Sequence, residues 1–208
     1  MIELSELQRD ALGEIFNIGV GRAASSLSLV VGEEVTMSAP STTLCRLEVA
    51  QDALRGAEFR HFSMVSQMFS GAFHSKAMLV FPEANALEIV RLMAGAANLS
   101  IEELSEFEQE AMCEVGNIIL NACMSALADM FRIELEGTLP LHRFGDSRNI
   151  IFDSDHTDTD EALVLLLQVD MFINQRRIHG HIIFLLTVNS LSTLLALVDG
   201  YLAEQGIV

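Results

Sequence analysis

The sequence predicts an α/β fold with pseudo-two-fold symmetry, in which two similar halves build one sheet with long helices packed on it. Three observations support this expectation: an internal repeat of about a hundred residues, the same order of helix and strand patterns in both halves, and the absence of a Pro/Gly/Ser-rich linker between them. We therefore expect residues 1–208 to form a single domain made of two repeats, about 1–98 and 99–208.

The repeat is clearest at the start of each half. Residues 3–40 align without gaps with residues 103–140, and the alignment continues less regularly to the end of the chain. Positions identical in the two halves are found at Glu3, Leu4, Ser5, Glu6, Ala11, Glu14, Asn17, Ile18, Ser25, Leu27, Glu34 and Pro40, each of which recurs 100 residues later.

A long helix opens each half. Ser5 with Gln8, and Ser105 with Glu108, have the spacing of a capping box, in which side chain and backbone at a helix start satisfy each other. Apolar residues then follow with helical period, and neither stretch contains a proline until residue 40 or 140. The pattern predicts two helices of about 25 residues that start at these serines.

Strands and a short helix complete each half. Strand-like segments at 34–38 and 133–139 are each closed by a proline, which cannot donate a hydrogen bond to a sheet. After a loop of undefined structure come two predicted hairpins, 61–69 with 73–81 and 163–173 with 178–187. Short helices are then expected at 83–93 and 189–198, ended by Gly95 and Gly200.

Charge and composition limit the classes of partner. The net charge is −17, with only 12 Lys and Arg, so phosphate backbones and anionic lipid surfaces are unfavourable partners. No apolar run reaches the ~20 residues of a membrane helix, and the acidic N-terminus does not resemble a secretory signal. We expect a cytoplasmic protein whose cysteines, Cys45, Cys113 and Cys123, are reduced thiols.

The candidate site is a duplicated acid and amide pair, Glu14 with Asn17 and Glu114 with Asn117. Residues three apart lie about 60° apart around a helix, so each pair projects from one face. The same stripe continues along a track of small or polar residues, which a partner's backbone could approach: Gly21, Ala24 and Ser28 on the first helix, Asn121 and Ala128 on the second.

Glutamate and asparagine on an amphipathic helix are ordinarily a solvated surface. The repeat favours a functional reading of both pairs. Asparagine is a mediocre helix former, and a solvent-facing position has no packing reason to keep the same acid and the same amide in two halves that have diverged.

The motif is similar to that of the CheC/CheX/FliY family of chemotaxis phosphatases, and most similar to the CheC type, which has two such motifs. The residues that carry the resemblance are Glu14-Ile15-Phe16-Asn17-Ile18-Gly19-Val20-Gly21-Arg22-Ala23-Ala24-Ser25-Ser26-Leu27-Ser28 and Glu114-Val115-Gly116-Asn117-Ile118. One departure is Phe16, where the second motif has Gly116, the commoner residue in this family; the ring is either part of the core or alters docking.

The resemblance implies hydrolysis of the aspartyl phosphate of a CheY-type response regulator. Asn17 and Asn117 would position an in-line water, as a glutamine does in GTPases, and Glu14 and Glu114 would pair with the regulator's lysine. The divalent metal, Mg²⁺, is expected on the substrate regulator, and no cofactor of its own is expected for this chain.

Two alternatives from other classes remain open. The chain could be a non-enzymatic scaffold of the chemotaxis or flagellar switch apparatus, as FliM is, or a regulator that binds the receptor deamidase CheD. The expected partners are thus a phosphorylated response regulator and CheD, with the chain itself a monomer or weak homodimer.

Two other groups could attract metal ions. The acidic segment 153–161 lacks the glycine and distant glutamate of a calcium loop, so we interpret it as a solvated turn. His179 and His181 share one face of a strand, but the sequence places no third ligand beside them.

Overall fold

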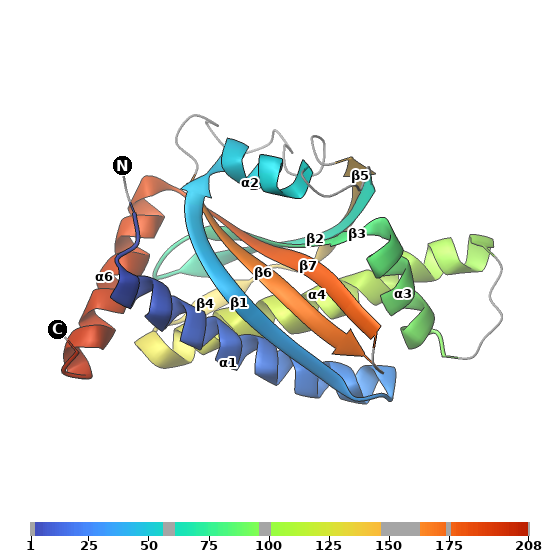
Figure 1. The fold of residues 1–208 in the computed structure, drawn as a ribbon, viewed down its shortest axis with the longest axis horizontal. Coiled ribbons are helices and arrows are strands. Elements are labelled where there is room, and N and C mark those ends of the chain that lie inside the picture. Colours follow the sequence, from blue (N-terminus) through green and yellow to red (C-terminus); the bar gives the residue numbers. More distant parts are fainter. Residues whose placement is uncertain (1–2, 56–60, 96–100, 147–162, 174–175, 208) are drawn as a thin grey trace.

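The computed structural model describes residues 3–55, 61–95, 101–146, 163–173 and 176–207 (Figure 1). In chain order the elements are α1 (Glu6–Val31), β1 (Val35–Arg46), α2 (Leu47–Arg55), β2 (His61–Gly71), β3 (Ser75–Pro82), α3 (Glu83–Met93), α4 (Ile101–Phe131), β4 (Leu135–Gly137), β5 (Leu141–Asp146), β6 (Leu163–Ile173), β7 (Arg176–Leu186) and α6 (Val188–Glu204).

The strands form one antiparallel sheet in the order β1-β6-β7-β3-β2-β4, with β5 also paired to β2. The central pair joins β3 of the first half to β7 of the second. The first strand of each half pairs with the hairpin of the other half, because β1 lies beside β6 while β4 and β5 lie beside β2. The predicted fold class, two halves that share a sheet, is confirmed, whereas the domain limits stay a prediction.

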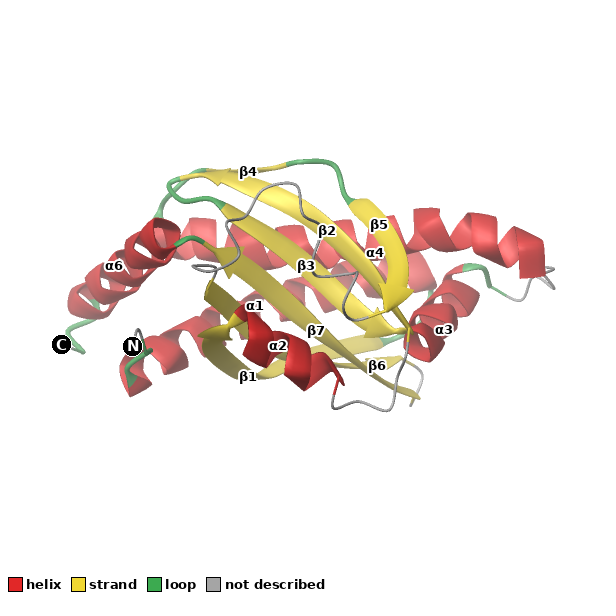
Figure 2. Ribbon diagram, turned by 90° about the horizontal axis from the view of Figure 1, so that it is seen from above, coloured by secondary structure: helices red, strands yellow, loops and turns green. Residues whose placement is uncertain are grey.

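The helices cover the sheet unequally. The long helices α1 and α4 lie side by side on one face, with α3 and α6 at its two ends, and α2 lies on the opposite face (Figures 1 and 2). The larger apolar core lies between the long helices and the sheet. A smaller core joins α2 to the other face, where Leu47, Ala50 and Leu54 pack on strand residues.

The prediction that a proline closes the first strand of each half was wrong for the first half. Strand β1 does not end before Pro40 but runs on to Arg46, and its register with β6 shifts between Ser38 and Ser41. In the second half Pro140 instead separates the short β4 from β5. A residue without an N–H is tolerated at an edge or at an irregularity of the ladder. Pro40 accordingly lies within the register shift of β1, and Pro140 lies between two strands.

The helix starts and ends were predicted in part. The capping box at Ser5 and Gln8 is present, with both hydrogen bonds formed. The second box is wrong, because α4 already begins at Ile101 and Ser105 lies inside it. Gly95 has the positive φ of a helix end, whereas α6 continues through Gly200 to Glu204. The undefined loop of the first half contains α2.

Helix α4 has an apolar stretch, Phe107–Phe131, whose length and composition would suffice to cross a membrane. More than half of it is buried against the rest of the protein. That burial is what a core helix of a globular domain requires. The expected cytoplasmic location stays a prediction.

Candidate functional site

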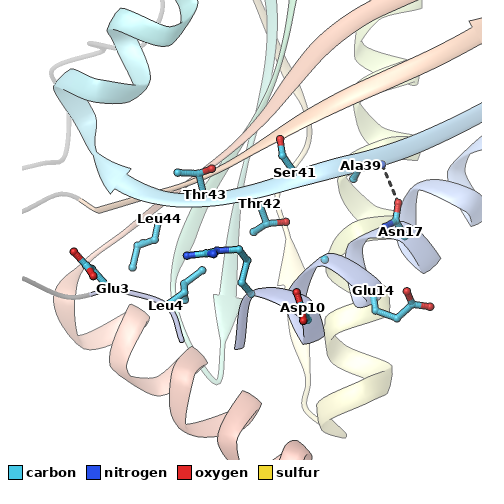
Figure 3. Close-up of a pocket in the computed structure, with 12 residues that line it drawn as sticks. Glu3, Leu4, Asp10, Glu14, Asn17, Ala39, Ser41, Thr42, Thr43 and Leu44 are labelled. Atoms are coloured by element: carbon cyan, nitrogen blue, oxygen red, sulfur yellow. Dashed lines mark hydrogen bonds between the residues drawn. The ribbon is translucent and has the colours of Figure 1, made fainter. Parts of the chain in front are cut away.

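The first acid and amide pair lies exposed on α1, as predicted. Glu14 and Asn17 both face outward, while their neighbours Ile15 and Phe16 are fully buried. The Oδ1 atom of Asn17 accepts a hydrogen bond of 2.9 Å from the backbone N–H of Ala39 in β1 (Figure 3). The side chain is thereby fixed between helix and strand.

An open groove of about 650 Å³ lies beside this pair, between the first half of α1 and the edge strand β1. Three acidic side chains, Glu3, Asp10 and Glu14, line the groove, and Arg9 is the basic residue of its lining. The acids come from the α1 side, while β1 contributes mainly small and hydroxyl-bearing residues (Figure 3). Its lining residues are Glu3, Leu4, Arg9, Asp10, Gly13, Glu14, Asn17, Ala39, Ser41, Thr42, Thr43 and Leu44. A side chain that enters the groove would therefore reach Glu14 and Asn17.

The second pair lies at the corresponding place on α4, where Glu114 is exposed and Asn117 is half-buried. The Oδ1 atom of Asn117 accepts hydrogen bonds from Asn121 Nδ2 at 2.8 Å and from Gln67 Nε2 at 3.2 Å. Gln67 belongs to β2 and is only 2% exposed. The two asparagines therefore lie in equivalent places but have different neighbours.

The small-residue track was predicted incorrectly beyond the two pairs. Ala24 is buried, and the hydroxyl of Ser28 accepts a hydrogen bond from the backbone N–H of Val35 at the start of β1. Gly21 is exposed, but Asn121 is engaged with Asn117, and Ala128 is half-buried. Strand β1 thus covers the end of the track on α1, and of the predicted track on that helix Gly21 stays accessible.

The difference between Phe16 and Gly116 has a packing cause. Phe16 is fully buried and stacks on Phe184 with ring centroids 5.2 Å apart. At Gly116 a Cβ atom would lie 2.3 Å from a methyl group of Val65, so only glycine fits beneath β2. The aromatic ring therefore belongs to the core and does not enter the exposed site.

The cysteines do not supply a nucleophile. All three are free thiols. Burial raises the pKa of Cys45 and that of Cys113, the latter against a smaller lowering by a hydrogen bond from the backbone of His142, and raises the pKa of Cys123 to about 12. Because the thiolate is the reactive form, these side chains are chemically quiet near neutral pH.

The histidine pair does not point to a metal site. His179 Nδ1 lies 2.6 Å from Asp170 Oδ1, and Arg177 binds the other oxygen of that carboxylate at 3.1 Å. Burial raises the pKa of Asp170, but the hydrogen bonds and charges of Arg177 and His179 outweigh it, so the pKa is lowered. In the described ranges no three His, Cys, Asp or Glu side chains are grouped to hold a metal. Segment 153–161 lies outside the described residues.

Acidification is expected to destabilise the protein through two half-buried histidines, His142 and His181. Burial lowers the pKa of His142 and, with a smaller contribution from His179, that of His181, below the usual 6.5. The unfolded chain therefore binds more protons below about pH 6.5, and the free energy of unfolding decreases as the pH falls from about 6.5 to the lower folded pKa. Urea unfolding at several pH values measures this slope.

The control is the same series with His181→Gln. Its slope should be shallower, because glutamine does not titrate and His142 alone of the two positions then contributes. A slope identical to that of the wild type would show that His181 does not contribute.

Two neighbours of the site were missed in the sequence. Ala39 acts through its backbone, which leaves no signal in residue type. Gln67 does carry one, because it is an amide in the middle of a strand, flanked by the apolar residues Val65 and Phe69 on the same face. A polar side chain in such a strand must find a buried hydrogen-bond partner.

The fold defines the class of the chain: it is an α/β domain of the type seen in FliY. The crystal structure of FliY from Thermotoga maritima superposes with a TM-score of 0.76 at 19% identity, covering 97% of this chain and all of that one. The complex of CheX with CheY, BeF₃ and Mg²⁺ from Borrelia burgdorferi contains a chain that matches with a TM-score of 0.51 at 17% identity, covering 83% of this chain and 96% of that one.

Sequence comparison narrows the class. The model of the CheC-like family matches residues 7–44, which include the first pair and the start of β1. The CheY-P phosphatase CheC of Bacillus subtilis is 28% identical over 139 residues, and the flagellar motor switch phosphatase FliY of the same organism 26%. Each match covers 66% of this chain, but 66% of CheC and 36% of FliY. The chain is a homologue of these phosphatases, which confirms the resemblance to the CheC/CheX/FliY family.

Proposed function

We propose that this protein hydrolyses the aspartyl phosphate of a CheY-type response regulator, with Glu14 and Asn17 as one site and Glu114 and Asn117 as the other. The observation that carries the proposal is that both pairs lie at the surface of equivalent helices. In each pair the side-chain oxygen of the asparagine accepts a hydrogen bond from the protein. The named phosphatase relatives support the same reaction.

The reaction needs little from the protein because an acyl phosphate is already reactive. A water must be held in line with the phosphorus and the leaving carboxylate. The Nδ2 hydrogens of Asn17 or Asn117 can donate to that water, whose other lone pair then attacks. Attack breaks the P–O bond to the aspartyl carboxylate, and the proton of the water leaves with inorganic phosphate.

Glu14 and Glu114 would anchor the regulator. Each lies one helical turn before its asparagine, on the same face, and is exposed. A carboxylate at this position can form a charge-assisted hydrogen bond with a lysine of the docked partner. Mg²⁺ on the regulator would neutralise charge on the phosphoryl oxygens; the described part of this chain has no cluster of its own to bind it.

A scaffold or a CheD-binding adaptor is the alternative. In either case the protein would bind its partner without accelerating loss of phosphate. Mixing the purified chain with a regulator phosphorylated by a small acyl-phosphate donor, and following inorganic phosphate, separates these classes. Acceleration above the regulator's own rate supports the phosphatase, and binding without acceleration supports the scaffold.

Removal of the carboxylates of both glutamates is expected to weaken binding of the regulator more than it slows the hydrolysis step. For Glu14→Gln with Glu114→Gln we expect KM to rise about tenfold, the equivalent of roughly 1.4 kcal/mol for a lost charged hydrogen bond, with a smaller fall in kcat. Glu110→Gln, on the same helix, is the matched control for a lost exposed charge. An unchanged KM would contradict the anchoring role.

A further inference from the structure

The two asparagines have the same orientation, but different groups produce it. At the first site the donor to Asn17 is the backbone N–H of Ala39. A backbone N–H can only donate, so the bonded atom is the amide oxygen. The Nδ2 group of Asn17, for its part, has no hydrogen bond to any residue in the described part of the chain.

At the second site two side-chain amides perform this task. Gln67 Nε2 also donates to the backbone oxygen of Thr138 at 2.8 Å, and Asn121 Nδ2 also donates to the backbone oxygen of Asn117 at 2.8 Å. Backbone oxygens accept only, which identifies the nitrogen end of each amide. Both groups next to the Asn117 carboxamide are therefore donors, and its oxygen must face them.

The first half has no counterpart of this pair of donors. Gly21 occupies the position equivalent to Asn121 in the repeat. The residue equivalent to Gln67 follows from the sheet register. On β2, Gln67 lies between the residues that pair with β4 and the residues that pair with β5. On β6, Val169 lies at the equivalent place, opposite the point where the register with β1 shifts. Val169 is fully buried and apolar.

We propose that Gln67 is a positioning residue of the second site, which together with Asn121 fixes the carboxamide of Asn117 with its Nδ2 group outward. This inference rests on the proposed function. In the first half β1 supplies a main-chain N–H donor to Asn17, so the neighbouring strand β6 needs no polar residue. In the second half the edge is interrupted between β4 and β5, and Gln67 replaces that donor. Unrelated groups thus impose one orientation on both amides, which is expected if the outward N–H group is the working end.

The test isolates each site. Asn17→Ala leaves only the second site, and Asn117→Ala leaves only the first. Gln67→Leu keeps the approximate volume of the buried side chain but removes its hydrogen bonds to Asn117, Thr138 and Asn121. In the Asn17→Ala background we expect Gln67→Leu to lower kcat about tenfold with KM within about twofold, because the amide becomes free to turn. In the Asn117→Ala background it should change kcat less than about twofold.

Several results would overturn the proposal. An equal loss in both backgrounds would mean that Gln67 acts only through the fold, and no loss in the Asn17→Ala background would mean that it positions nothing. Inactivity of the Asn17→Ala protein alone would also overturn it, since there would be no second site to position. If the wild type itself does not accelerate phosphate loss, the proposed function fails instead. Asn121→Gly, which reproduces Gly21, should show the same dependence on background as Gln67→Leu.

Discussion

Replacement of both asparagines is expected to reduce phosphate loss to the regulator's own rate. The double variant Asn17→Ala with Asn117→Ala removes the only carboxamides of the two pairs, and a positioned polar group of this kind is typically worth a factor of about 10² to 10⁴. Each single variant should retain the activity of the other site. The measurement is the time course of inorganic phosphate from a regulator phosphorylated by a small donor.

The folded state should survive these changes. Asn17 is exposed and Asn117 half-buried, and alanine is a better helix former than asparagine. Asn189→Ala, an exposed asparagine on α6 far along the chain from both pairs, is the matched control and should keep full activity. If the double variant hydrolysed the acyl phosphate at the wild-type rate, the site assignment would be wrong.

Substitution of Gly19 is expected to give a large loss of stability. Helix α1 packs closely on α4 at this residue, and a Cβ atom there would lie 2.8 Å from the Cα of Cys123 and 3.2 Å from the backbone oxygen of Ala122. Backbone atoms of a packed helix cannot move aside independently. We expect Gly19→Val to lower the free energy of unfolding by about 3 kcal/mol, as for severe overpacking of a core. Urea unfolding measures it.

The control uses another helical glycine. At Gly200, inside α6, an added Cβ would meet no atom within 4 Å other than its chain neighbours and the backbone of its own helix. Valine and glycine have similar, unfavourable helix propensities, so Gly200→Val should change stability by less than about 0.5 kcal/mol. Equal effects of the two substitutions would show that propensity, and not the contact between α1 and α4, determines the loss.

Features that depend on neighbouring residues were predictable from the sequence. The Ser5 and Gln8 capping box, the hairpins and α3 all arise from interactions a few residues apart, and each was found close to its expected place. The end of β1 was not predictable in this way. Its continuation past Pro40 depends on β6, which lies more than a hundred residues later and supplies the pairing partners. The missing N–H of Pro40 predicted that the strand ends there, but the pairing of β1 with β6 continues past this residue.

The candidate site, too, was predictable only where it depends on residues close together in the chain. The positions of Glu14 and Asn17 on one helix face followed from helical period, and the repeat drew attention to them. Their hydrogen-bond partners did not follow, because Ala39 and Gln67 reach the asparagines across 22 and 50 residues of chain. Contacts of this kind are set by sheet register, and one residue of register decides whether a side chain faces the helix or the opposite surface.

The exchange of first strands between the halves has a consequence for shortened chains. Residues 1–95 alone would contain β1 without β6 and β2 without β5, leaving unsatisfied backbone edges on both sides. Such a fragment could complete its ladder only by borrowing strands from a second copy of itself. Truncation midway should thus yield intertwined dimers or aggregates in place of a folded half-length monomer.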